Sequence, residues 1–148
     1  MRPSRQIHLD FHTSEFIDSI GKDFSKADFE KHLRLAKVNS INLFAKCHHS
    51  WSYYPTKVGE QHPNLKFDLL GQQIEVCQKL GIEVNLYYTV GWSFNDAEKN
   101  PDWCVRNKDG TILTSNELIE DNPEAALPSF HWKFLCLNSP YHLMIMKQ

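Results

Sequence analysis

The sequence has no surplus of charge of either sign. Lysine and arginine together number 16 and acidic residues 18, so the formal net charge is −2, and the basic residues are scattered along the chain. Nucleic acids and anionic membrane surfaces require a clustered basic face. We therefore expect no nucleic-acid partner and no membrane partner.

Long apolar runs are missing as well. No stretch reaches the roughly 18–20 apolar residues that cross a bilayer. The first residues, 1–6, lead into an alternating segment without the apolar run of a signal peptide. From these absences we expect a cytoplasmic protein.

Closely spaced cysteines are a third absence. Cys47, Cys77, Cys104 and Cys136 include no Cys-x-x-Cys pair, and they stand about 30 residues apart. This spacing excludes a zinc ribbon and a dense disulfide framework. Free thiols in a reducing compartment are the simplest interpretation.

What the chain does contain is an alternation of strands and helices over 148 residues, the length of a single domain. Alternating apolar residues predict strands at 6–12, 40–46 and 82–90, and a fourth short strand at 134–138. Apolar residues at helical spacing predict one helix after Ser25 and another between Asp68 and Gly81. Short helix-to-strand connections favour βα units and a parallel sheet.

Each predicted strand has one apolar and one polar face. The polar faces carry His8, Asp10, His12, Asn42, Lys46, Glu83, Asn85, Tyr87, Thr89 and Asn138. A doubly wound sheet buries two apolar faces under helices, whereas a (β/α)8 barrel places one face of every strand inside. Buried polar groups then bind one another or a polar ligand, and both interpretations stay open.

The predicted fold class is therefore α/β, as the N-terminal half of a TIM-type (β/α)8 barrel with about four parallel strands and helices on the outside. Half a barrel is expected because a full one needs about 200 residues or more. We expect one domain over 1–148, with a loop insertion at 93–131. That insertion contains a small hairpin around 107–110 and an acidic, mobile surface loop at 114–128.

The stretch 40–56 is the most informative part of the sequence. Its alternating strand runs into Cys47, two histidines and a group of aromatic residues before Pro55. Such a loop at the carboxyl end of a strand is typical of a binding site. The alternative is that the loop aromatics cover the core.

Three segments resemble the α-L-fucosidase-like glycoside hydrolases. Phe-Ala-Lys-Cys-His-His-Ser-Trp-Ser-Tyr-Tyr-Pro-Thr-Lys-Val-Gly at 44–59 resembles their Ala-Lys-His-His-Asp-Gly strand and loop, although Cys47 is inserted between lysine and the histidine pair. Gly-Ile-Glu-Val-Asn-Leu-Tyr-Tyr-Thr-Val-Gly-Trp at 81–92 is similar to their next strand, and His-Leu-Asp-Phe-His at 8–12 to their first. The whole pattern looks most like the "hypothetical glycosyl hydrolase 6" type, which is grouped near β-galactosidases.

The resemblance implies a carbohydrate substrate, with His12 and the pair His48 and His49 on the sugar hydroxyls. By their chemistry, Lys46 could donate a further hydrogen bond to the sugar, and Trp51 and Trp92 could stack on its apolar face. The predicted substrate-binding residues are His12, Asp10, Lys46, His48, His49, Trp51, Tyr87 and Trp92. Core packing remains the alternative for each aromatic, including Tyr53, Tyr54 and Trp103. We expect no cofactor and no metal in this interpretation.

The same resemblance places the catalytic nucleophile at the end of a strand that follows the helix beginning near Pro140, and the general acid later still. Glycoside hydrolysis needs two carboxylates flanking the bond. Only Asp10 and Glu83 are predicted to face inward, and Glu83 opens its strand at the barrel bottom. No catalytic residue is therefore assigned, and the chain alone is expected to be inactive.

Two alternatives remain. His8, Asp10, His12 and His48 are a conceivable zinc or manganese ligand set of a metal-dependent, amidohydrolase-like barrel. The chain is otherwise a non-catalytic carbohydrate-binding fragment. Besides the carbohydrate substrate, we expect as partner either a second copy in an oligomer or the missing C-terminal half of the barrel.

Overall fold

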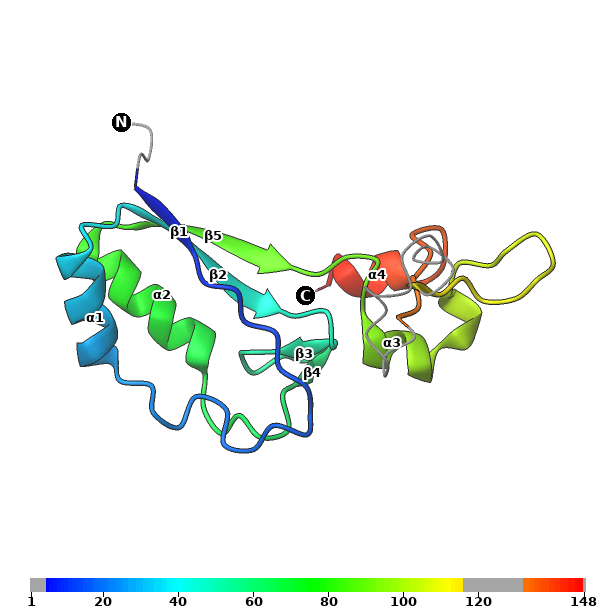
Figure 1. Cartoon of the computed structure of the whole chain (residues 1–148), viewed down its shortest axis with the longest axis horizontal. Helices are drawn as coiled ribbons and strands as arrows, with labels where there is room; N and C mark the ends of the chain where they lie inside the picture. The colour runs from blue at the N-terminus through cyan, green and yellow to red at the C-terminus, as the bar shows by residue number, and fades with distance from the viewer. Residues whose placement is uncertain (1–4, 116–131, 148) are drawn as a thin grey trace, which may run out of the picture. The chain divides into compact units, whose positions relative to one another are not determined.

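The structure of the chain, a computed structural model, describes residues 5–115 and 132–147. It divides into two compact units. Unit 1 comprises 1–47 and 51–88, and unit 2 comprises 48–50 and 89–148. Unit 1 is a mixed α/β structure with a sheet of parallel strands and two helices, whereas unit 2 is built from short elements (Figure 1).

The sheet of unit 1 is centred on β2 (Ser40–Lys46). β1 (Gln6–His8) and β5 (Glu83–Tyr88) pair with β2 in parallel on its two sides. β3 (Trp51–Ser52) returns antiparallel to the end of β2, and β4 (Glu60–Gln61) is parallel to β3. The predicted parallel βα arrangement is therefore confirmed for β1, β2 and β5.

Helices α1 (Lys26–Leu35) and α2 (Leu69–Leu80) lie side by side over one face of this sheet (Figure 1). Each begins where the sequence predicts, because the Asp28 amide donates to the Ser25 hydroxyl at 3.2 Å and the Gly71 amide to the Asp68 carboxylate at 2.7 Å. α2 ends at Gly81, whose φ of 66° lies in the left-handed region that glycine adopts without steric cost.

β2 contributes to a separate core cluster on each face. Ile41, Leu43 and Ala45 point towards the helices and join the first core cluster, which also contains Leu33, Val38, Leu70, Val76, Cys77 and Ile82. Phe44, on the face predicted to be polar, instead joins the second core cluster, together with Ile20, Cys47, Trp51, Tyr53, Leu65 and Leu69. That face is therefore more apolar than the alternation predicted.

Two predicted strands are shorter in the structure. The first was expected to reach residue 12, but its pairing with β2 ends at His8. Beyond that point the Phe11 carbonyl accepts a hydrogen bond from the Tyr53 hydroxyl. The backbone here is therefore bound by a side chain and not by strand pairing. The third, expected at 82–90, covers Glu83–Tyr88, because the Ile82 amide closes the end of α2 by donating to the Cys77 carbonyl.

The expectation of a fourth parallel strand at 134–138 is wrong. Lys133, Phe134 and Leu135 form isolated antiparallel bridges to Thr114, Trp92 and Cys104, all within unit 2. Leu137 and Asn138 lie in a turn. The alternation at 134–138 reflects these bridges, which sequence periodicity does not distinguish from a parallel strand.

Unit 2 contains α3 (Phe94–Lys99), the 3-10 helix η1 (Pro101–Trp103) and α4 (Tyr141–Ile145). The predicted small hairpin is present, with Arg106 bridged to Ile112 and a turn closed by the Gly110 amide on the Asn107 carbonyl. Its buried cluster consists of Ala97, Cys104, Leu135 and Tyr141. Over the part of the chain that the structure describes, unit 2 thus has a core of its own, with fewer residues than either cluster of unit 1.

All four cysteines are free thiols, as predicted. Among the described residues, no helix combines the length and apolar content needed to cross a bilayer. Most of the predicted acidic loop, 116–128, lies outside the described residues. The single-domain boundary and the insertion at 93–131 stay predictions.

Candidate functional site

Four rings of unit 1 meet at the carboxyl ends of its parallel strands. Phe44 of β2 and Tyr87 of β5 are register partners, and their rings stack with centroids 4.2 Å apart. His12 meets both rings edge-on, at 5.0 and 5.6 Å, and His8 does so at 5.4 and 6.2 Å. We call His8, His12, Phe44 and Tyr87 the four-ring cluster.

Asp10 joins the two histidines of this cluster. Its Oδ1 lies 3.0 Å from His12 Nε2 and 3.7 Å from His8 Nε2. Burial lowers the pKa of His12 below its ordinary value, and the nearby Asp10 carboxylate opposes that shift more weakly. His12 is therefore mainly neutral near pH 7, and a neutral imidazole both donates and accepts a hydrogen bond.

The metal alternative finds no geometric support in the described part of the chain. No group of three or more histidine, cysteine, aspartate or glutamate side chains there is placed to hold a metal ion. His8, Asp10 and His12 share a neighbourhood, but the two histidines use the same carboxylate oxygen and point to it by Nε2. This arrangement is that of an ion-pair and hydrogen-bond cluster.

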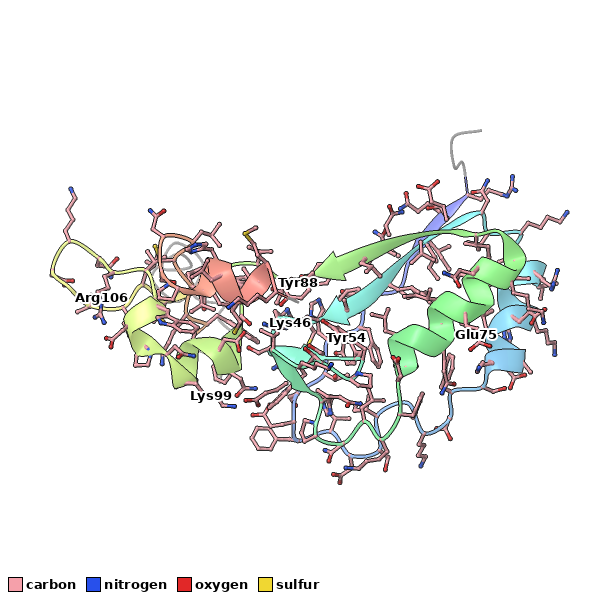
Figure 2. All side chains as sticks on the ribbon, turned by 180° about the vertical axis from the view of Figure 1, so that it is seen from behind. Lys46, Tyr54, Glu75, Tyr88, Lys99 and Arg106 are labelled. Carbon is pink, nitrogen blue, oxygen red and sulfur yellow. The ribbon has the colours of Figure 1, made fainter. Side chains whose placement is uncertain are left out.

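Lys46 closes the carboxyl end of β2 and is fully buried, with 0% exposure. Its ammonium lies 5.4 Å from the ring centroid of Tyr88, the last residue of β5 (Figure 2). An ammonium over an aromatic face in a desolvated position is held by cation–π attraction. Lys46 is therefore a fixed cationic group at the same end of the sheet as the four-ring cluster.

Trp51 lies in the second core cluster, with 8% exposure. Its indole N–H donates to the Glu15 carboxylate at 3.3 Å, and its ring meets His62 edge-on at 6.0 Å. Trp51 is therefore packed in the core, as the alternative to sugar stacking expects. Tyr53 is buried in the same cluster, and Tyr54 packs against the first.

The histidine pair belongs to unit 2, where its backbone is fastened to α3. The His48 carbonyl accepts from the Phe94 amide at 2.8 Å, and the His49 carbonyl from the Asn95 side-chain amide at 2.8 Å. Ser50 follows with a φ of 82°, a left-handed conformation, and its hydroxyl accepts from the Asp96 amide at 3.0 Å. These bonds fix the backbone from which the two imidazole side chains extend.

Trp132 packs against both histidines. Its ring centroid lies 4.6 Å from that of His48 and 5.1 Å from that of His49, each at a steep angle. Trp92, 42% exposed, stacks on Phe134 with centroids 5.5 Å apart, and it also neighbours Trp132. Unit 2 therefore carries a part-exposed aromatic surface beside its histidine pair.

The structure thus distributes the predicted site residues over two groups. Unit 1 holds Asp10, His12, Lys46, Trp51 and Tyr87, and unit 2 holds His48, His49 and Trp92. Sequence reasoning missed Phe44 and Trp132. An aromatic residue on the otherwise polar face of 40–46 was a signal for Phe44, whereas Trp132 follows no periodic segment and had none.

Comparison with known proteins agrees with the resemblance of the sequence. The family model described as "Hypothetical glycosyl hydrolase 6" matches residues 25–148. No curated protein matches the chain.

Two solved structures share the fold. Alpha-L-fucosidase isoenzyme 2 from Paenibacillus thiaminolyticus is 41% identical, with a TM-score of 0.82 over 98% of this chain. This chain spans only 21% of that fucosidase. A hypothetical protein from Ruminiclostridium thermocellum is 10% identical, with a TM-score of 0.62 over 97% of this chain and 67% of its own, which is a likeness of fold alone.

Proposed function

This chain belongs to the hypothetical glycosyl hydrolase 6 family, and from that premise we propose that it is the sugar-binding part of a fucosidase- or β-galactosidase-like glycoside hydrolase domain. The observation that carries the proposal is the four-ring cluster with Asp10, at the carboxyl ends of parallel strands. In α/β enzymes this end of the strands holds the substrate.

The polar groups suit a sugar. Neutral His12 donates its one N–H, at Nε2, to the Asp10 carboxylate, which orients the ring, and it meets a sugar hydroxyl as an acceptor through Nδ1. The stacked Phe44 and Tyr87 rings both contact that imidazole at a steep angle and hold its place. In unit 2, His48 and His49 have the same hydrogen-bonding capacity, and Trp92 presents an exposed ring for the apolar face of a pyranose.

We propose that the parent domain is a (β/α)8 barrel. β1, β2 and β5 stand in chain order, are all parallel and carry both connecting helices on one face, whereas a doubly wound sheet uses both faces. Among the described residues, β5 pairs only with β2, and Leu86 is 55% exposed. In the proposed barrel, a further βα unit covers this edge.

The catalytic carboxylates lie elsewhere in that barrel. A retaining glycosidase holds two carboxylates about 5–5.5 Å apart. Asp10 is the acidic side chain that contacts the histidines of the four-ring cluster, and Glu83 opens β5 at the opposite end of the strand. The free thiols support a cytoplasmic protein. The lack of charge clustering is consistent with an uncharged partner such as a carbohydrate.

Calorimetry with L-fucose and D-galactose tests the binding role. We expect weak, millimolar-range affinity for one of the sugars. His12→Ala removes the imidazole and should abolish that affinity, whereas His32→Ala, on the exposed side of α1, should leave it unchanged. Equal loss in both variants, or no effect of His12→Ala, would remove the site assignment.

Turnover of nitrophenyl glycosides tests the absence of the catalytic pair. The purified chain should release no nitrophenol above the buffer rate, because one carboxylate cannot act as both nucleophile and general acid at the required positions. Steady turnover that Asp10→Asn abolishes would show that the chain carries its own catalytic acid.

A further inference from the structure

His12 lies on a segment that the sheet does not hold. Pairing of β1 with β2 ends at His8, so residues 9–13 have no ladder partner in β2. Yet His12 keeps a defined place against Phe44, Tyr87 and Asp10. Some other contact must therefore fix the backbone on which its ring stands.

That contact is the hydroxyl of Tyr53, which is fully buried. It donates to the carbonyl of Phe11 at 2.9 Å and lies 2.7 Å from the hydroxyl of Thr13. A phenol has one proton, and a carbonyl can only accept, so the proton goes to Phe11 and Thr13 donates to the Tyr53 oxygen. The two residues that flank His12 are thus bound to one atom.

Tyr53 is itself anchored on both sides of its backbone. Its amide donates to the Ala45 carbonyl of β2 at 3.0 Å, and its carbonyl accepts from the Leu70 amide of α2 at 3.0 Å. A third bond runs from the Cys47 thiol to the Thr13 carbonyl, with sulfur and oxygen 3.8 Å apart. The segment around His12 is therefore tied to the central strand and to α2 through side chains.

We propose that Tyr53 is a positioning residue for His12, which it sets in the four-ring cluster by binding Phe11 and Thr13. Burial raises the pKa of Tyr53 far above its ordinary value, so the donor proton is retained across the pH range of a folded protein. The consequence for sugar binding rests on the proposed function, but the placement of His12 does not.

Tyr53→Phe tests the inference, because it removes one oxygen and keeps the buried ring. NMR signals of the His12 ring report its place directly, since the neighbouring Phe44 and Tyr87 rings shift them by ring currents. We expect those shifts to shrink towards free-histidine values. The pKa of His12 should also rise towards the ordinary 6.5, because burial is its largest lowering cause; Asp10, His8 and Tyr87, the groups that face it, are unchanged by the substitution.

Tyr54→Phe is the matched control. It removes a phenol oxygen from the next residue, whose ring packs on the first core cluster, and it should leave the His12 signals in place. A loss of stability alone does not move the native His12 spectrum. Folded Tyr53→Phe protein with unchanged His12 shifts and pKa would overturn the proposal.

Thr13 gives a second route to the same answer if Tyr53→Phe does not fold. Thr13→Val keeps the shape and removes the hydroxyl, so it should displace His12 in the same direction, and Thr13→Ser should restore the original spectrum. Thr13→Val protein whose His12 signals match those of the unaltered chain would contradict the role of this network.

Sugar affinity separates this inference from the proposed function. If the chain binds sugar through His12, Tyr53→Phe should weaken binding about three- to tenfold, the range expected for one net hydrogen bond. If the unaltered chain binds no sugar, the proposed function fails while the NMR shifts still decide the placement. Sugar binding lost in His12→Ala but retained in Tyr53→Phe would count against the positioning role alone.

Discussion

The two units satisfy their backbone polar groups in different ways. In unit 1, β1, β2 and β5 form a continuous ladder, and α1 and α2 are capped by side chains three positions away. In unit 2, strand pairing is reduced to isolated bridges, and the first turn of α3 is capped by Ser50, 46 positions earlier in the chain. Local sequence therefore explains unit 1 much better than unit 2.

The candidate site residues follow the same division. Phe44 and Tyr87 of the four-ring cluster lie on neighbouring strands, so the stacking of these two rings follows from register. The histidine pair of unit 2 depends on contacts with α3 and Trp132, which come from distant parts of the chain. If this contrast is right, mutations in the two units should differ most in the buried cores and least on the surface.

Truncating buried side chains should give the largest difference in stability loss between the two units. Ile41→Ala empties a fully buried position between sheet and helices, and we expect it to lower the free energy of unfolding by about 2–5 kcal/mol. Leu135→Ala, in the smaller cluster of unit 2, should cost less, because fewer buried neighbours surround it. Urea unfolding measures both, and a larger loss for Leu135→Ala would reverse the comparison.

Removing helix caps should show that α2 depends on a neighbouring residue, whereas α3 depends on a residue far away in the sequence. Asp68→Ala removes the cap of α2 and should cost about 1 kcal/mol without disturbing unit 2. Ser50→Gly tolerates the left-handed φ of 82° but removes the cap of α3, and it should also shift the NMR signals of His49. Unchanged His49 signals in Ser50→Gly would show that the histidine pair does not depend on the contact between Ser50 and α3.

The pH dependence of stability should come from unit 1. His62 is buried, its Nε2 lies 3.0 Å from the Ser14 carbonyl, and its Nδ1 accepts from the Asn64 amide at 3.1 Å. Burial lowers the pKa of His62, as it does that of His12. The unfolded chain then binds more protons, so stability is present above the unfolded pKa of about 6.5 and is lost as pH falls below it.

His62→Gln isolates this effect. Glutamine retains hydrogen-bonding capacity but does not titrate, so the variant should lose less stability between pH 7 and pH 5 than the unaltered chain. Thermal unfolding at a series of pH values measures it. An identical pH profile in the variant would assign the acid sensitivity to other groups.

Surface ion pairs should matter least, in both units alike. Lys26 and Glu75 join α1 and α2 at 2.6 Å, with Glu75 visible on α2 in Figure 2, and Lys133 pairs with Glu98 in unit 2. Because such pairs are screened by solvent, Lys26→Ala and Lys133→Ala should each change stability by at most about 1 kcal/mol. A double-mutant cycle with Glu75→Ala or Glu98→Ala gives the coupling itself.

Much of unit 1 was predictable because its signals are local. Ser25, Asp68 and Gly81 delimit the helices, and the alternation at 40–46 gives a strand whose three apolar residues reach the first core cluster. The segments that resemble fucosidases indicated the family before any coordinates. Periodicity could not tell that Lys133, Phe134 and Leu135 form antiparallel bridges, since the partner of a strand depends on distant residues.

The sequence alone predicted the α/β class, the starts of α1 and α2, the end of α2, the family, and the histidines and aromatics available for binding. The three-dimensional contacts were needed to see that β1 stops at His8, that Phe44 stacks on Tyr87, and that the Tyr53 hydroxyl binds the segment carrying His12. The physical reason is that capping and periodicity act over a few residues, whereas ring stacking and buried hydroxyl bonds join residues some 40 positions apart.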